Sequence, residues 1–321
     1  MQNYPYAPVL LITFNRPDYT AKVVERLREI KIPKLYVFND GPRDGNDKDV
    51  KARAEIKEII EVIDWDCELN LYYSPRNLGC GIGVSSAISW AFTNEDRLVI
   101  LEDDCVPSPA FFPYCNELLE KYKDDNRIWL ISGENHQYPD WAFKLSDYIF
   151  SQFGYNCGWA TWKRCWDHFD INMSRLPDFL ESNLLDSVFS DKRIVKTYKI
   201  KYKRLFFDKV KPSFWTIQFG FQMISNRGYV IIPRANLIEN IGVLGDHTTV
   251  ANKYINVKSV EEFQIYKHPL FILPNTSVEL YQYNARIKPM IEGKATYIRV
   301  IRRLLRTFTR CFPSQAKTRI K

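Results

Sequence analysis

The sequence lacks the apolar segments that mark membrane-spanning and secreted proteins. No stretch of its 321 residues approaches the roughly 20 consecutive apolar residues of a membrane span. The apolar run from Ala7 to Phe14 is short and follows no basic region, so the pattern of a secretory signal is also missing. These two absences favour a cytoplasmic protein.

Cysteine occurs, but not at the spacings that indicate a zinc site or a disulfide framework. The seven cysteines are odd in number and include no C-x-x-C pair. Scattered, reduced and mostly buried thiols are typical of a reducing compartment. The cysteines are Cys67, Cys80, Cys105, Cys115, Cys157, Cys165 and Cys311.

Acidic residues are missing from residues 293–321, which hold nine of the 45 Lys and Arg and none of the 38 Asp and Glu. The formal charge of +7 therefore becomes about −2 for the rest of the chain, and we expect no nucleic-acid partner. Residues 297–312 read as a basic amphipathic helix, a pattern typical of attachment to an anionic membrane surface. A helix packed on the domain with a solvated basic face is the alternative. Attachment would place the protein on the inner face of the membrane.

Strand and helix patterns alternate through the first 135 residues and predict a mostly parallel α/β sheet flanked by helices. In such a sheet ligands bind outside the carboxyl ends of the strands, so loops near residues 15, 40, 76 and 103 converge on one crevice. The expected strands are 8–14, 35–38, 69–73, 98–101 and 128–132, and the expected helices of this part include 17–30, 50–63 and 84–92.

Three consecutive carboxylates, Glu102, Asp103 and Asp104, follow the strand at 98–101. Like charges this close repel strongly, and a divalent cation is their natural partner. Mg²⁺ and Mn²⁺ prefer one or two carboxylates together with phosphate oxygens and water. The alternative is a solvated acidic turn in which Asp104 caps the next helix.

The run LVILEDDCVPSPAFF, with TFNRPDYT near the start and SPRNLGCGIGVSSAI between them, resembles glycosyltransferases of the GT-A fold. The likeness is greatest to the family of the N-acetylglucosaminyltransferases of N-glycan processing and its bacterial relatives. Together with the change of pattern near residue 135 and the charge of the tail, it predicts a nucleotide-sugar-binding half at 1–135, an acceptor-side half of the same Rossmann-like domain at 136–292 and a basic tail at 293–321. It also implies inverting transfer from a nucleoside diphosphate-sugar, UDP favoured, to a hydroxyl of a glycan, and attachment through the basic tail would suit a lipid-linked glycan as the acceptor.

The resemblance assigns roles to residues at the crevice. Asp104 would be the direct ligand of Mn²⁺ or Mg²⁺, while Glu102 and Asp103 would bind hydroxyls of the donor. A plain turn is the alternative for Asp40, and a surface arginine the alternative for Arg76. The remaining donor contacts implied are Thr13, Asn15 and Arg16 at the nucleotide, Asp40 at the base or ribose, and Arg76 and Asn77 at the diphosphate.

An inverting transfer needs a general base, which in these relatives tends to be a carboxylate just after a tryptophan. Here Thr216 follows Trp215 and cannot serve, which leaves Glu134 and Asp246 as candidates and His247 as a further metal ligand. A structural histidine is the alternative for His247. The departure also keeps a non-catalytic nucleotide-sugar-binding protein open. A sugar-1-phosphate nucleotidyltransferase is a further alternative, although its glycine-rich N-terminal loop is missing.

Overall fold

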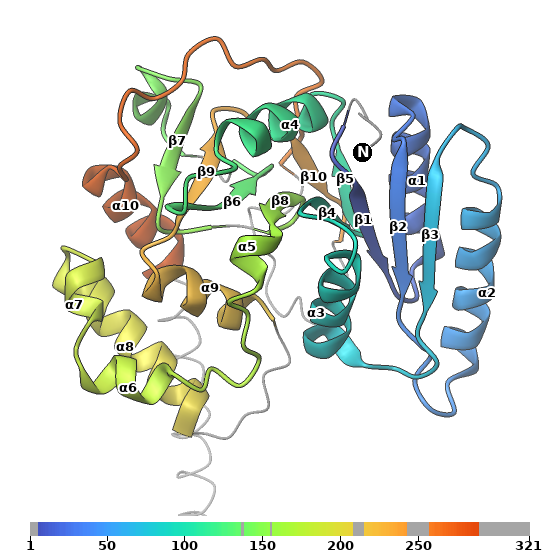
Figure 1. Cartoon of the computed structure of the whole chain (residues 1–321), viewed down its shortest axis with the longest axis horizontal. Helices are drawn as coiled ribbons and strands as arrows, with labels where there is room; N and C mark the ends of the chain where they lie inside the picture. The colour runs from blue at the N-terminus through green and yellow to red at the C-terminus, as the bar shows by residue number, and fades with distance from the viewer. Residues whose placement is uncertain (1–5, 136–137, 155, 208–214, 243–256, 289–321) are drawn as a thin grey trace, which may run out of the picture.

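The computed structural model describes residues 6–135, 138–154, 156–207, 215–242 and 257–288 (Figure 1). The expectations for Asp246, His247 and residues 293–321 fall outside these residues. The strands are β1 (Val9–Thr13), β2 (Lys34–Asn39), β3 (Glu68–Tyr73), β4 (Arg97–Glu102), β5 (Cys105–Pro107), β6 (Ile128–Ser132), β7 (Tyr148–Ser151), β8 (Trp159–Trp162), β9 (Tyr229–Pro233) and β10 (Ile238–Asn240).

The helices divide into those beside the N-terminal strands and those of the second half. The first group is α1 (Pro17–Ile30), α2 (Asp47–Glu61), α3 (Gly79–Ala91) and α4 (Phe111–Lys121). The second group is η1 (Asp140–Phe143), α5 (Lys163–Trp166), α6 (Leu176–Glu181), α7 (Leu185–Val188), α8 (Lys192–Phe207), α9 (Thr216–Ser225), α10 (Thr276–Gln282) and η2 (Tyr283–Ile287). None of the described helices combines the length and the apolar character that crossing a membrane requires.

Eight strands form one sheet in the order β3-β2-β1-β4-β8-β6-β9-β7. The first four are mutually parallel, as are β6 and β9, whereas β8 and β7 run antiparallel to their neighbours. The expected fold class, a mostly parallel α/β sheet flanked by helices, is therefore confirmed. Because β8 lies between β4 and β6, the sheet continues across the boundary near residue 135. A separate antiparallel pair joins β10 to β5.

Strands β1, β2 and β4 match their expected positions within one or two residues, because each is an apolar run buried on both faces of the sheet. Helix α3 differs, since it begins at Gly79 and not near Val84. The carboxylate of Asp40 accepts hydrogen bonds from the backbone N–H groups of Leu78 and Gly79, at 2.9 and 3.0 Å. An acceptor from a distant loop thus satisfies the first turn of the helix, which lengthens it toward the N-terminus.

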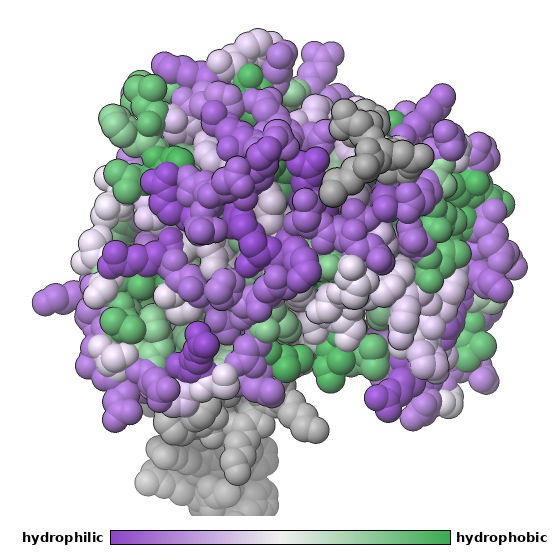
Figure 2. All heavy atoms as spheres, viewed as in Figure 1, coloured by the Kyte–Doolittle hydropathy of each residue, from purple (hydrophilic) through white to green (hydrophobic). Residues whose placement is uncertain are grey.

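Two apolar clusters hold the fold together. The larger one packs both faces of the sheet against helices such as α1, α3 and α4. The smaller one joins α6, α7 and α8 to α9 and includes Leu176, Tyr202 and Phe221. Figure 1 shows α6 to α8 grouped at the lower left, away from β1 to β3. The face in Figure 2 is largely hydrophilic, with apolar residues in smaller groups.

Candidate functional site

A cleft of about 560 Å³ lies where β1, β2 and β4 end. Its walls come from the loops after these three strands, from the start of α3 and from Gly242, which follows β10. The carboxyl ends of parallel strands meet at one edge of a sheet, so this is the crevice that the strand order predicts. Eight of the expected site residues line it, namely Thr13, Asn15, Arg16, Asp40, Asn77, Glu102, Asp103 and Asp104.

The acidic triplet lines the cleft, and two of its members are paired with one arginine. Nη1 of Arg16 lies 3.2 Å from Oδ1 of Asp103 and 3.0 Å from Oδ2 of Asp104. Burial, together with the charges of Asp104 and Asp103, raises the pKa of Glu102 to about 8. Burial also raises the pKa of Asp103 to about 7, although the Arg16 charge opposes it. Charge compensation of the triplet is thus incomplete, which suits a divalent cation.

Asp40 borders the cleft, and its carboxylate is held by hydrogen bonds from neighbouring residues. Its carboxylate accepts hydrogen bonds from the N–H groups of Gly41, Leu78 and Gly79 and from Nδ2 of Asn77. Burial raises the pKa of Asp40, and these N–H donors oppose the rise. Asp40 and Asn77 therefore fix the start of α3 at the cleft, which directs the positive end of the helix dipole toward the cleft.

Arg43 lines the cleft and was not among the residues expected from the sequence. Its Nε and Nη2 donate to the two carboxylate oxygens of Asp49, at 2.6 and 2.9 Å, and its guanidinium lies 5.5 Å from the centre of the Phe14 ring. Nδ2 of Asn15 donates to the same Asp49 at 2.8 Å. The Arg43 hydrogen bonds lower the pKa of this buried carboxyl well below its ordinary value. Asp49 thus anchors two residues of the cleft wall.

Other expected residues lie away from the cleft lining. Arg76 is exposed and does not belong to the lining. Glu134 is buried just after β6, where Oε2 accepts a hydrogen bond from the backbone N–H of Cys157 at 3.2 Å. Its charge contributes to the raised pKa of Glu102. Thr216 begins α9 and lines a different pocket, together with Phe153 and Tyr202.

Strand β8 contains two tryptophans, Trp159 and Trp162, and both are core residues. Trp159 and Trp162 are buried, and the Trp159 ring stacks on that of Trp215 with 5.3 Å between centroids. The second tryptophan donates its indole N–H to the carbonyl of Leu119. Both tryptophans therefore pack in the core of the protein.

Residues 9–170, just over half of the chain, match the family model described as glycosyl transferase family 2. The chain belongs to this family. The cleft at β1, β2 and β4 lies within the matched residues, and the family is one of nucleotide-sugar glycosyltransferases of the GT-A fold.

Other comparisons add little about this glycosyltransferase. No curated protein matches it by sequence. Among solved structures, UDP-glucose pyrophosphorylase complexed with UDP-glucose is 9% identical with a TM-score of 0.34, covering 71% of this chain and 90% of that one. The apo form of UDP-glucose pyrophosphorylase gives 9% and 0.34 over 70% and 90%. Likenesses this weak carry no conclusion about activity.

Two kinds of metal-binding atoms meet beside the cleft of the glycosyltransferase. The carboxylate oxygens of Glu102 and Asp104 are hard donors that fit Mg²⁺ or Mn²⁺. One carboxylate oxygen of Asp104 and the sulfur atoms of Cys105 and Cys157 lie within 4.8 Å of one another. Thiols are soft donors and favour a different class of ion. No sequence pattern indicated this cluster, because Cys157 is 52 positions away from Cys105.

Proposed function

We propose that this glycosyltransferase moves a sugar from a nucleoside diphosphate-sugar, with uridine the favoured nucleoside, to a hydroxyl of a glycan or lipid-linked glycan. The proposed transfer inverts the anomeric centre and uses Mn²⁺ or Mg²⁺ held by Asp104. The observation that supports it most is the meeting of the acidic triplet with Arg16, Arg43 and the start of α3 in one cleft. A cation site beside anion-binding groups matches the charges of a metal-bound diphosphate.

The groups of the cleft divide between the two ends of such a donor. A bound metal would neutralise the diphosphate as it departs. Arg43, and Arg16 once released from Asp104, would donate charged hydrogen bonds to phosphate oxygens, and the N-terminus of α3 would add its dipole. Glu102 and Asp103 would accept hydrogen bonds from sugar and ribose hydroxyls.

The proposed general base is Glu134 or Asp246. The charge of Glu134 acts on Glu102, which supports a position close to the triplet. Thr216 has no basic group for this step. If no other residue accepted the proton, the protein would bind its donor without turning it over. A non-catalytic donor-binding protein is therefore the alternative, and slow hydrolysis of the bound donor distinguishes the two.

The test is binding of a panel of nucleoside diphosphate-sugars, with and without Mn²⁺, to the wild type, to Asp104→Ala and to Asp124→Ala as an exposed control. We expect metal-dependent binding of one donor that is lost in Asp104→Ala and kept in Asp124→Ala. Failure of every donor to bind in the presence of metal would exclude the proposal. Binding of a nucleoside triphosphate with release of pyrophosphate would instead indicate a nucleotidyltransferase.

We also propose that the enzyme works in the cytoplasm at the inner face of a membrane, attached through residues 293–321. The nine basic residues of this tail, without acidic ones, support attraction to anionic lipid. Sedimentation with anionic and neutral vesicles tests this. We expect binding to anionic vesicles only, and weaker binding when Arg302, Arg303 and Arg306 are replaced by Gln.

A further inference from the structure

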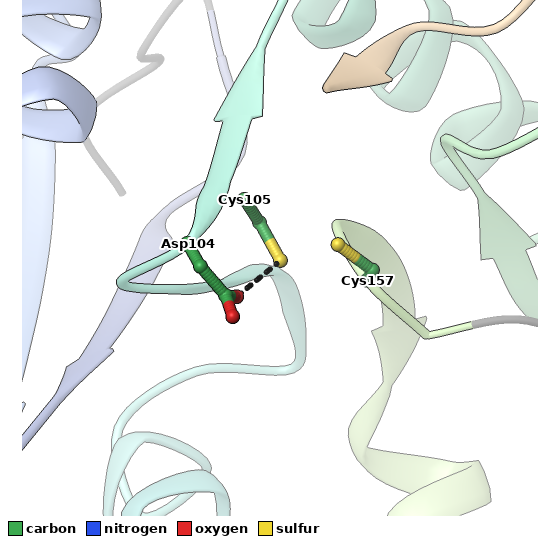
Figure 3. Close-up of side chains that lie close together, drawn as sticks. All are labelled: Asp104, Cys105 and Cys157. Carbon is green, nitrogen blue, oxygen red and sulfur yellow. Dashed lines mark hydrogen bonds between the residues drawn. The ribbon is translucent and has the colours of Figure 1, made fainter. Parts of the chain in front are cut away.

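The thiols of Cys105 and Cys157 point toward each other and toward Asp104 (Figure 3). Sγ of Cys105 is 3.5 Å from Oδ1 of Asp104, and the three ligand atoms all lie within 4.8 Å of one another. The ligand atoms of a tetrahedral zinc ion are roughly 3.5 to 3.8 Å apart, given its bond lengths to sulfur and oxygen. A small inward movement would thus bring these three atoms to coordination distance.

The backbone around the two thiols is held by strand pairing. Asn240 of β10 is the register partner of Cys105 in β5, and its Nδ2 donates to Sγ of Cys157 at 3.1 Å. A donor to the sulfur atom stabilises the thiolate form that a metal requires. Gly158, directly after Cys157, has φ of +63°, and a Cβ there would overlap Ile238 of β10. Glycine therefore allows the Cys157 loop to approach β10 closely.

The surroundings of the thiols are acidic. Glu102, Asp104 and Glu134 are the carboxylates whose charges act on Cys157, and its backbone N–H donates to Glu134. These negative charges disfavour a free thiolate, but they attract a divalent cation. The positive charge of the bound cation then stabilises the thiolate. Two thiols and a carboxylate together select zinc-like ions over magnesium, because sulfur is a soft ligand.

We propose that Asp104, Cys105 and Cys157 form a site for a thiophilic divalent ion such as Zn²⁺, beside the donor cleft. Binding replaces the two S–H bonds by two sulfur–metal bonds and releases both protons to solvent, while Asp104 adds an oxygen ligand. The fourth position of the ion stays open to water.

Asp104 connects this site to the donor cleft, since Oδ1 faces Cys105 while Oδ2 is paired with Arg16. An ion held between the thiols coordinates the Asp104 carboxylate, which the proposed function assigns to Mn²⁺ or Mg²⁺. Zinc is therefore expected to inhibit donor binding, and this consequence rests on the proposed function. The binding of zinc itself does not.

The experiment measures zinc binding directly, by competition with a chromophoric chelator, and thiolate coordination by the ultraviolet charge-transfer band of Cd²⁺. The wild type is compared with Cys157→Ser, Cys105→Ser and Asp104→Asn, with circular dichroism to check folding. Cys157→Ser is the decisive variant because Cys157 is only partly buried, whereas Cys105 is 1% exposed. Cys67→Ser is the control, and Cys80→Ser tests the thiol that lines the cleft.

We expect one zinc ion per chain, a Cd²⁺–thiolate band, and an affinity lowered about 100-fold in Cys157→Ser but unchanged in Cys67→Ser and Cys80→Ser. Absence of zinc binding in the wild type would overturn the proposal. So would zinc binding that survives Cys157→Ser and is lost in Cys80→Ser. If zinc binds as expected but no nucleoside diphosphate-sugar does, the metal site stands and the proposed function fails.

Discussion

The guanidinium of Arg16 pairs with the carboxylate of Asp104, with 3.0 Å between Nη1 and Oδ2. The same nitrogen is 3.2 Å from Asp103. The loop after β1 thus supplies a positive charge to the loop after β4, at the carboxylate proposed as the metal ligand. The neighbouring carboxylates outweigh the desolvation of Arg16, so its pKa is raised and it remains charged. Metal and arginine therefore compete for one carboxylate, and a bound diphosphate offers the displaced guanidinium a new partner.

Arg16→Met is expected to tighten Mn²⁺ binding in the absence of donor and to weaken donor binding. Loss of a partly exposed ion pair is worth about 1 kcal/mol, or about fivefold in metal affinity. Titration calorimetry with Mn²⁺ alone and then with the donor separates the two effects. Arg26→Met is the control, because Arg26 of α1 pairs with Glu29 and Glu261 and does not line the cleft. Equal Mn²⁺ affinities for wild type and Arg16→Met would show that the pair does not restrain Asp104.

Asp49→Asn is expected to release Arg43 and Asn15 from the cleft wall. Loss of the charged hydrogen bonds lowers the free energy of unfolding by about 2 kcal/mol at pH 7 and weakens donor binding. Since the pKa of Asp49 is lowered in the fold, its contribution is full above its unfolded pKa and is lost as pH falls toward its folded pKa. Urea unfolding at pH 7 and pH 3 checks this, because the wild type and the variant should differ less in acid.

Gly242→Ala is expected to displace Asp104 without unfolding the protein. A Cβ at Gly242 would overlap the Asp104 carboxylate, so we expect Mn²⁺ binding to weaken by about tenfold, equivalent to 1.4 kcal/mol. Gly220→Ala in α9 is the matched control, since a Cβ added at this position would have no heavy atom within 4 Å. Unchanged metal affinity in Gly242→Ala would argue against Asp104 as a ligand.

Glu134→Gln is expected to keep donor binding while lowering the transfer rate by about 10²- to 10⁴-fold, the usual contribution of a general base. The substitution retains the oxygen that accepts the Cys157 N–H. Thr216→Ala should leave the rate unchanged, since a threonine hydroxyl cannot act as the base. If Glu134→Gln transfers the sugar at the wild-type rate, the role of general base falls to Asp246 and not to Glu134.

Glu279→Gln is expected to remove a pH dependence of stability that has nothing to do with catalysis. Burial raises the pKa of Glu279 to about 7, although Ser151 and the N–H of Gln152 donate to it. A raised folded pKa means that its favourable contribution is full below the unfolded pKa, near 4.5, and is lost as pH rises through 7. Between pH 5 and 8 the wild type should lose up to about 3 kcal/mol relative to Glu279→Gln, measured by urea unfolding. Parallel pH profiles would refute this.

The sequence predicted what local patterns determine. The apolar strand before Glu102 and the helix that opens at Pro17 follow from periodicity and from proline placement, and both appear as expected. Because parallel strands end at one edge, the positions of Arg16 and Asp40 at a common cleft could also be predicted. These inferences need only the order of the strands, which local signals give.

Features that depend on distant contacts could not be predicted. Arg43 enters the cleft through its pairing with buried Asp49, and nothing in a single sequence shows which arginine has such a partner. The approach of Cys157 to Cys105 requires β8 to pair beside β4, out of chain order. The cysteines therefore looked scattered in the sequence, and two of them are adjacent in the fold.

The position of β8 in the sheet also determines which fragments of the protein can fold on their own. A fragment that ended near residue 135 would keep β4 and β6 but lose the strand between them, and β4 would present an open edge of unpaired backbone groups. Such an edge favours aggregation over a soluble half-protein. The two halves should therefore unfold in one cooperative step, and a minimal donor-binding fragment must extend at least through Trp162.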